Sequence, residues 1–236
     1  MPCSLFISDL HLSDDTPAIE SGLLAFLARE QAADALYILG NLFEAWVGDD
    51  DDAPLAQRIR DALAAYSAAG TALYILRGNR DFLLGEQFAS DIGATLLDDY
   101  TTIDIAGEPT LLMHGDLLCT DDTDYLQFRA MVHDPNWQAA ALSKPLDERR
   151  QLARQLRAMS ADAASNKPED IMDVNADAVY KALADAGVQR LIHGHTHRPA
   201  RHNMAAGECI VLGDWGKTGW YLRAEGSTLS LEKFAL

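Results

Sequence analysis

Five short, mainly apolar runs are spread along the chain, and each is followed directly by small or polar residues. The runs cover residues 4–8, 35–39, 72–76, 110–113 and 190–192. Apolar runs of this length with turn-forming residues behind them are typical of strands buried on both faces. The sequence therefore predicts a set of buried strands that end in polar residues.

Amphipathic stretches that predict helices separate these runs. They cover residues 17–30, 54–69, 82–92 and 175–186. Strands that alternate with helices predict an α/β fold with a largely parallel central sheet. Near the end of the chain, glycines separate three short runs. These runs predict antiparallel strands that flank the core, and one possible arrangement is a second sheet. These runs are residues 209–212, 220–223 and 228–233.

Residues 120–170 contain no predicted strand and have a helical, amphipathic pattern. Within them, residues 144–157 hold five basic and two acidic residues, a local charge of 5 − 2 = +3. One interpretation is a solvated helix face with pairs four residues apart. The other is a basic, partly apolar cap that accepts an anionic or lipidic ligand. The acidic run at residues 49–52 predicts a solvated loop.

Composition narrows the class of protein. The chain has 236 residues, 48% of them hydrophobic and 23% charged, which predicts one globular domain over residues 1–236. A net charge of −17 repels phosphate backbones, so no nucleic acid partner is expected. Cys3, Cys119 and Cys209 lack metal-site or disulfide spacing, and no run is apolar enough to span a membrane. We expect neither secretion nor a membrane span, and a reducing cytoplasm fits best.

Each of the five predicted strands is followed by side chains that can bind a metal ion. These are Asp9, His11, Asn41, Asn79, His114, His195 and His197. The carboxyl ends of strands in an open α/β sheet meet in one crevice, so we expect these side chains to converge. Nitrogen and oxygen ligands without cysteine suit Mn²⁺, Fe²⁺ or Zn²⁺. Seven ligands fit two ions with one bridging residue, the usual apparatus for displacement at phosphorus.

Short blocks around these ligands resemble those of the calcineurin-like metallophosphoesterases. The blocks read Ser8-Asp-Leu-His11, Gly40-Asn-Leu-Phe-Glu44, Gly78-Asn-Arg-Asp81, His114-Gly-Asp116 and Gly194-His-Thr-His197. The resemblance implies central mixed β-sheets flanked by helices and a binuclear metal site. Residues 43–50, 114–122, 171–174 and 193–199 further resemble the UDP-2,3-diacylglucosamine pyrophosphatases of lipid A biosynthesis, over essentially the whole chain.

That narrower resemblance implies specific roles. Asp9, His11 and His197 would hold one Mn²⁺ and Asn79, His114 and His195 the other, with Asn41 bridging. The catalytic positions would be Asn79, Arg80, His114 and His195. The substrate contacts would be Asn79, Arg80, Asp122, Ser160, Ala164, Lys167 and His195. At residue 164 an alanine replaces the polar residue expected there, and Asn166 is a candidate substitute.

The resemblance also implies where and on what the protein acts. Residues 120–170 would form a helical cap for acyl chains, on a peripheral protein at the cytoplasmic face of the inner membrane. The substrate would be UDP-2,3-diacylglucosamine, cleaved by metal-activated water at the α-phosphorus to UMP and 2,3-diacylglucosamine 1-phosphate (lipid X). We expect no protein partner.

Arg80 stands where many relatives of this superfamily have histidine. A guanidinium does not give up its proton, so this site suits a leaving group that needs none. Attack on the α-phosphorus of a nucleotide diphosphate sugar releases a phosphate monoester, which is stable as an anion. Arg80 is therefore expected to neutralise the diphosphate.

Asn41 departs from the family's Gly-Asp block. An amide offers one neutral oxygen in place of two anionic ones, which predicts weaker occupancy of at least one metal position and much lower activity. An introduced change and a natural variant both explain it. Two other functions stay open: hydrolysis of a soluble nucleotide or phosphodiester, and binding of the lipid nucleotide without hydrolysis.

Overall fold

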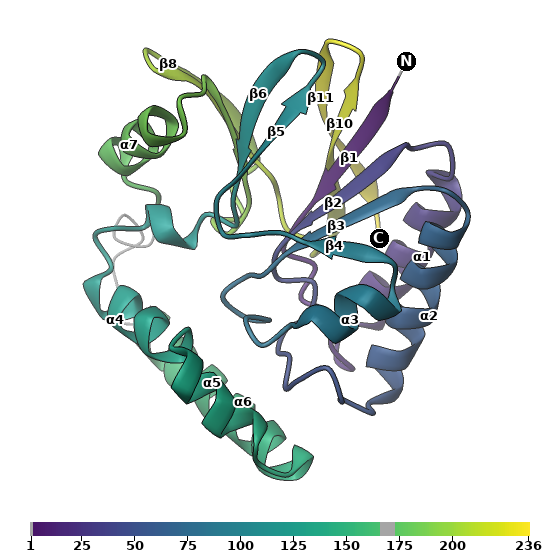
Figure 1. Cartoon of the computed structure of the whole chain (residues 1–236), viewed down its shortest axis with the longest axis vertical. Helices are drawn as coiled ribbons and strands as arrows, with labels where there is room; N and C mark the ends of the chain where they lie inside the picture. Colours follow the sequence, from purple (N-terminus) through teal and green to yellow (C-terminus); the bar gives the residue numbers. More distant parts are fainter. Residues whose placement is uncertain (1, 166–172) are drawn as a thin grey trace.

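The computed structural model describes residues 2–165 and 173–236, and for residues 161–165 it describes the backbone alone. Its strands form two sheets (Figure 1). The first has the order β11-β10-β1-β2-β3-β4. Its strands are β1 (Cys3–Ile7), β2 (Ala35–Leu39), β3 (Ala72–Leu76), β4 (Ala94–Leu96), β10 (Thr218–Glu225) and β11 (Thr228–Ala235). Strands β1 to β4 run parallel, and β10 and β11 extend the sheet in antiparallel fashion beside β1.

The second sheet has the order β5-β6-β7-β9-β8. Its strands are β5 (Thr101–Ile105), β6 (Glu108–Leu112), β7 (Arg190–His193), β8 (Ala200–Met204) and β9 (Gly207–Val211). Here β6, β7 and β9 are parallel, and β5 and β8 pair antiparallel at the edges. The two sheets share an apolar core in which Phe6 and Leu39 pack with Leu112 and Ile192. Burial of both inner faces holds the sheets together.

Helices cover the outer faces of both sheets (Figure 1). The first sheet is covered by α1 (Pro17–Arg29), α2 (Pro54–Ala68) and α3 (Glu86–Asp91), which contribute Phe26, Leu63 and Phe88 to one cluster of buried side chains. Helix α7 (Ala176–Ala186) packs Val179 and Leu183 against the second sheet. This arrangement confirms the predicted α/β class with mixed sheets flanked by helices.

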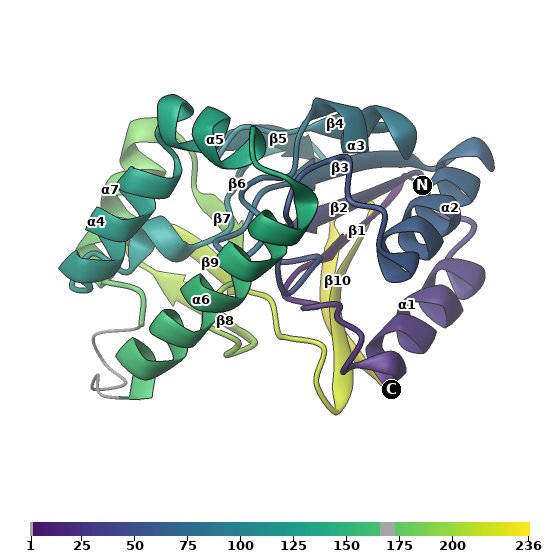
Figure 2. The same ribbon diagram turned by 90° about the horizontal axis from the view of Figure 1, so that it is seen from below.

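Between β6 and β7 the chain leaves the sheets. A short turn of 3₁₀ helix, η1 (Asp116–Leu118), leads into α4 (Thr123–Val132), α5 (Pro135–Leu142) and α6 (Leu146–Ser165). Carboxylates cap two of these helices: Asp122 accepts from the Tyr125 amide and Asp134 from the Trp137 amide. Figure 2 shows α6 lying across the edge at which strands of both sheets end. None of the helices in the described residues is long and apolar enough to cross a membrane.

The structure corrects one predicted helix boundary and two predictions about which strands share a sheet. Of the helix predicted over residues 82–92, only the part that forms α3 is helical, because the residues before Gly85 form turns. The five predicted strands lie in two sheets, whereas the apolar pattern predicted one largely parallel sheet. The three C-terminal runs do not form a sheet of their own: β9 joins the second sheet, and β10 and β11 join the first.

Candidate metal centre and adjoining cavity

The predicted metal ligands come together where the strands of both sheets end. Asp9 and His11 follow β1, Asn41 follows β2 and Asn79 follows β3 in the first sheet. The remaining three come from the second sheet, where β6 leads to His114 and β7 leads to His195 and His197. The convergence is the predicted one, but the crevice is formed by two sheets.

One group of donors consists of Asp9, His11 and His197. Their ligand atoms all lie within 4.8 Å of one another. The His11 Nε2 atom is 3.3 Å from His197 Nε2 and 3.7 Å from Asp9 Oδ1. Asp9 is fully buried, and its other oxygen accepts hydrogen bonds from the Ser8 hydroxyl and the His195 amide, both at 2.7 Å. A buried carboxylate with two imidazoles is a donor set that fits a divalent transition-metal ion.

The protonation states of Asp9, His11 and His195 also suit metal binding. Burial opposes ionisation of Asp9, but the hydrogen bond from His197 and the neighbouring histidines hold its pKa well below the usual range. Burial lowers the pKa of His11 to about 4. Burial and the nearby His114 lower the pKa of His195 to about 3. At neutral pH these groups therefore present a carboxylate and imidazole lone pairs, the forms that bind metals.

A second group of donors lies beside the first. The Nδ1 atom of His114 donates to the Leu39 carbonyl at 2.8 Å, so in the neutral ring Nε2 carries the lone pair. That lone pair faces the Asn79 Oδ1 atom at 3.0 Å. The ring of His195 lies 5.1 Å from that of His114. Two acceptors in contact fit a cation between them, but this group contains no anionic ligand.

Asn41, the residue expected to bridge two ions, lies between the two groups. Its Nδ2 donates to Asp9 Oδ1 at 3.0 Å and to Asn79 Oδ1 at 2.9 Å, while its Oδ1 accepts from the Arg80 amide at 2.9 Å. The Asp9 carboxylate accepts only and the Arg80 amide donates only, so this orientation is fixed by its partners. The amide presents nitrogen, which does not ligate, to both groups.

Backbone strain concentrates at these positions. Among the described non-glycine residues with positive φ, five of six are predicted metal ligands: Asp9, His11, Asn41, His195 and His197, at φ 53–68°. Left-handed backbone is costly for such residues and clusters at functional sites. Close packing adds to this, because a Cβ at Gly78 would overlap Asn41 Oδ1 and one at Gly194 would overlap Asp9 Oδ2.

Asp81 holds two of the ligand loops together. It is fully buried and accepts hydrogen bonds from the backbone amides of Gly78, at 2.7 Å, and of Asn41 and Leu42, at 3.2 and 2.7 Å. Asp81 belongs to the sequence block Gly78-Asn-Arg-Asp81, but the sequence alone did not predict a role for it. The signal in the sequence was its position, two residues after Asn79. That position alone does not distinguish a metal ligand from a residue that orders a loop.

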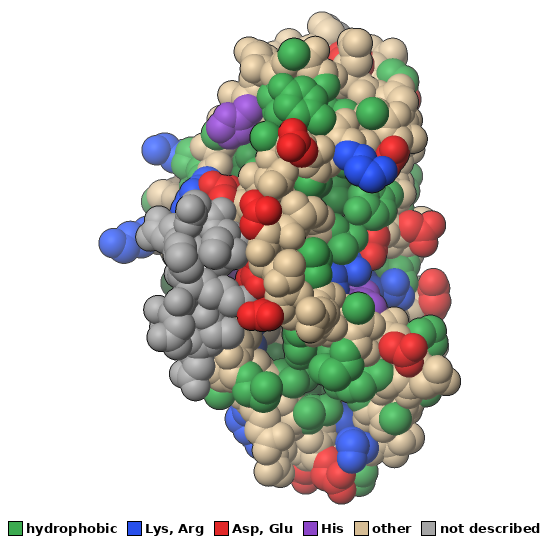
Figure 3. Space-filling model, turned by 90° about the vertical axis from the view of Figure 1, so that its left-hand side faces the viewer, with side chains coloured by type: hydrophobic (Ala, Val, Ile, Leu, Met, Phe, Trp, Pro, Cys, Tyr) green, Lys and Arg blue, Asp and Glu red, His purple; other side chains and the backbone are tan. Residues whose placement is uncertain are grey.

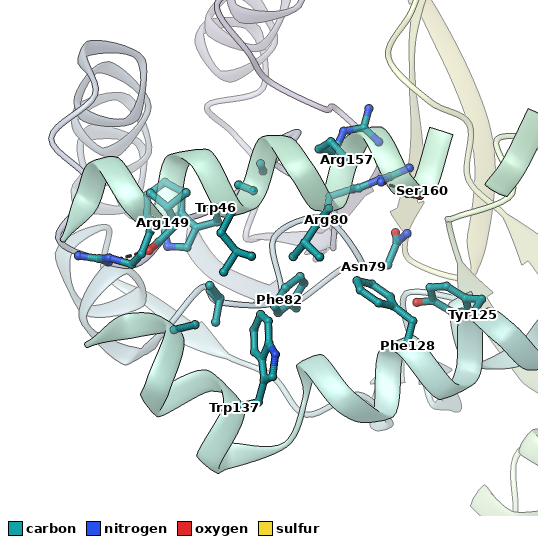
Figure 4. A pocket seen from close by; sticks show the side chains of 17 residues that line it. Trp46, Asn79, Arg80, Phe82, Tyr125, Phe128, Trp137, Arg149, Arg157 and Ser160 are labelled. Atoms are coloured by element: carbon teal, nitrogen blue, oxygen red, sulfur yellow. Dashed lines mark hydrogen bonds between the residues drawn. The ribbon is translucent and has the colours of Figure 1, made fainter. Parts of the chain in front are cut away.

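A cavity begins beside the second donor group and extends under α4 to α6. Asn79, Arg80 and Tyr125 line its polar end (Figure 4). Its apolar walls come from the core and from the three helices, among them Trp46, Phe82, Phe128, Trp137, Leu152 and Leu156. The Arg80 guanidinium donates to the Ser160 hydroxyl at 3.2 Å, and no carboxylate among the described residues pairs with it. A half-buried, unpaired guanidinium at the end of an apolar cavity fits an anionic group on an apolar ligand.

Comparison with known proteins identifies the family. The model of the calcineurin-like phosphoesterases matches residues 4–199. The chain belongs to the calcineurin-like phosphoesterase family. A UDP-2,3-diacylglucosamine hydrolase of Cellvibrio japonicus is 50% identical, and one of Escherichia coli is 48% identical, each over 98% of both chains. Among solved structures, an archaeal phosphodiesterase superposes with a TM-score of 0.52 at 12% identity, over 99% of each chain, and supports the fold alone.

The family assignment confirms the predicted enzyme class, a metal-dependent phosphoesterase. Of the predicted substrate contacts, Asn79, Arg80 and Ser160 line the cavity, and the His195 ring lies 6.2 Å from that of Tyr125. Asp122 caps α4 through its bond with the Tyr125 amide. The remaining predicted contacts lie outside the described side chains: Ala164, Lys167 and the candidate substitute Asn166.

The basic segment of this phosphoesterase pairs with the acidic run. Arg149 bonds both oxygens of Asp50 and the Val47 carbonyl, and Arg150 bonds Asp51 and Asp52. In the same acidic run, Asp49 accepts from the Gly85 and Phe88 amides and from Trp46 Nε1. Residues 49–52 form a loop in which Asp50 and Asp52 are exposed, as the prediction of a solvated loop requires. The prediction missed that the carboxylates of this run also attach α6 and α3 to the core.

Proposed function

We propose that this phosphoesterase hydrolyses the diphosphate bond of UDP-2,3-diacylglucosamine, giving UMP and lipid X in lipid A biosynthesis. The observation that carries this proposal is the junction of the donor cluster with the apolar cavity at Asn79 and Arg80. A substrate with a diphosphate beside two long acyl chains suits both parts of such a site. The names of the relatives at 48–50% identity support the same substrate.

We propose two Mn²⁺ ions as the cofactor. Asp9, His11 and His197 would hold one, and Asn79, His114 and His195 the other. When bound, such ions neutralise the phosphate charge and activate the attacking water. The first donor set fits an ion well, whereas the second has neutral donors and faces the Asn41 amide nitrogen.

Arg80 would bind and neutralise the diphosphate. Burial lowers the pKa of its guanidinium, yet an arginine stays protonated and cannot act as a general acid. The Ser160 hydroxyl fixes its direction. The departing phosphate monoester needs no proton, so the chemistry is consistent with arginine at this position.

We propose that helices α4 to α6 act as a cap, within residues 120–170, that takes the acyl chains at the membrane surface. Three large apolar side chains on these helices are exposed, Met131, Leu142 and Met159, the last at 65%. In Figure 3 hydrophobic side chains gather over the lower part of the molecule, where these helices lie. The protein would then be peripheral at the cytoplasmic face of the inner membrane, with no protein partner.

The test is release of UMP from UDP-2,3-diacylglucosamine with added Mn²⁺, comparing the unaltered chain with Asn41→Asp. We expect weak release by the unaltered chain and a large gain on the substitution. Soluble nucleotide diesters serve as competing substrates. Equal turnover of these, or no turnover of the lipid by either form, would overturn the proposed substrate.

The orientation of the Asn41 amide favours a second candidate, a variant that binds the lipid nucleotide without hydrolysing it. Retention of intact UDP-2,3-diacylglucosamine by the unaltered chain, with no UMP formed over long incubation, would support this alternative. Loss of the lipid at each wash would exclude it.

A further inference from the structure

Glu44 contacts both a predicted metal ligand and the helix that covers the site. Its Oε2 atom lies 2.7 Å from His11 Nδ1. Its Oε1 atom forms an ion pair with Arg157 on α6. The two oxygens of this carboxylate therefore contact two different elements, the loop after β1 and helix α6.

The contact with His11 fixes the state of that ring. An ionised carboxylate only accepts hydrogen bonds, so Nδ1 of His11 carries the proton and Nε2 carries the lone pair. Nε2 is the atom that faces Asp9 and His197. A carboxylate behind a histidine orients the ring and raises its basicity as a ligand.

The position of Glu44 is set by its own backbone and neighbours. Its amide donates to the Leu12 carbonyl at 3.0 Å, in a short parallel bridge between the loops after β1 and β2. The adjacent Phe43 stacks on Trp46 with ring centroids 4.6 Å apart, and both rings pack on Phe88. This rigid support is what a group that orients another side chain requires.

We propose that Glu44 is a positioning residue that orients His11 for metal binding and links this ligand to helix α6 through Arg157. The inference rests on the proposed metal site but not on the proposed substrate. Glu44 touches no reacting atom, so its effect should appear in metal affinity before any turnover.

The experiment is titration of the metal-free chain with Mn²⁺ alone, followed by the electron paramagnetic resonance signal of the free ion. Glu44→Gln should weaken the tighter Mn²⁺ site by about 10- to 100-fold, the usual effect of losing such a carboxylate. Glu20→Gln is the matched control, because Glu20 pairs with Arg58 at the surface, away from the site. It should leave Mn²⁺ binding unchanged.

A double-mutant cycle tests the link to α6. Arg157→Ala should weaken Mn²⁺ binding in the unaltered chain and have no further effect in a Glu44→Ala background. Tight binding by Glu44→Gln, or an additive effect of Arg157→Ala, would overturn the inference. If the unaltered chain binds no Mn²⁺, the proposed metal site fails and the inference with it, whereas failure of UMP release alone leaves it standing.

Discussion

The side-chain amide of Asn41 donates to the carboxylate of Asp9 across 3.0 Å, joining the ends of β2 and β1 at the centre of the candidate metal site. The same nitrogen donates to Asn79, so a neutral NH₂ group satisfies both donor groups at once. In the proposed metal site, cations would take the place of this nitrogen beside the same oxygens. The amide gives these oxygens a hydrogen-bond donor, whereas a carboxylate at this position would add a negative charge to the site.

This geometry predicts opposite effects of Asn41→Asp with and without metal. In chelator, the new carboxylate faces Asp9 and Asn79 without a donor, so the free energy of unfolding should fall by about 1–3 kcal/mol. With Mn²⁺ the new carboxylate would supply an anionic ligand, and the melting temperature should rise above that of the unaltered chain. Thermal unfolding in both conditions measures this. Asn203→Asp, on exposed strand β8, is the control and should respond to neither.

Gly194 packs against the first donor group. A Cβ there would overlap the Ser8 hydroxyl and the Asp9 carboxylate, so Gly194→Ala has to move one of them. We expect a loss of about 1–3 kcal/mol in stability, typical of overpacking, together with weaker Mn²⁺ binding. Gly216→Ala is the control, because its nearest atom would be 3.2 Å away at the end of the Asp214 side chain. Equal behaviour of the two variants would contradict this account of the loop.

The convergence of the candidate metal ligands was predictable because each follows an apolar run that is itself a local signal. The division of those runs between two sheets was not, since nothing in residues 110–113 or 190–192 marks their partners as different. Strand β8 was missed for a related reason: its Arg201, His202 and Asn203 are exposed and give no apolar pattern.

The roles of charged residues were the least predictable part of the site. Sequence reasoning found the basic residues of α6 and the acidic run at 49–52 but treated them separately. Arg149 and Asp50 are 99 residues apart, and only the folded chain places them in contact. Glu44 lay within a recognised motif, yet its link between His11 and Arg157 depends on the position of α6.

Arg149 should contribute more to stability than its exposed neighbour. Only 5% of its surface is exposed, and it bonds the Val47 carbonyl as well as Asp50. Arg149→Ala leaves that buried carbonyl without its partner, so we expect a loss of about 1–3 kcal/mol and faster proteolysis within α6. Arg154→Ala, at an exposed position of the same helix, should change stability by less than about 0.5 kcal/mol. The prediction fails if both variants unfold at the same denaturant concentration.

The stability of the chain should depend on pH through Glu30. Burial raises the pKa of this carboxyl. Hydrogen bonds from Arg29, at 2.8 Å, and from Arg223, at 2.6 Å, more than offset the effect of burial, so the pKa lies below its usual value. A lowered folded-state pKa stabilises the protein above the unfolded value, about 4.3, and that contribution disappears as the pH falls through the folded-state pKa.

Glu30→Gln should therefore destabilise the chain by about 1–2 kcal/mol at pH 7, and the difference from the unaltered chain should shrink steadily below about pH 5. Denaturant unfolding across this range measures it. Glu225→Gln, at an exposed end of β10, is the matched control and should show no such dependence. A Glu30→Gln deficit that stayed constant from pH 7 to acid would mean that the ion pairs with Arg29 and Arg223 contribute no stability, and that Glu30 acts through packing alone.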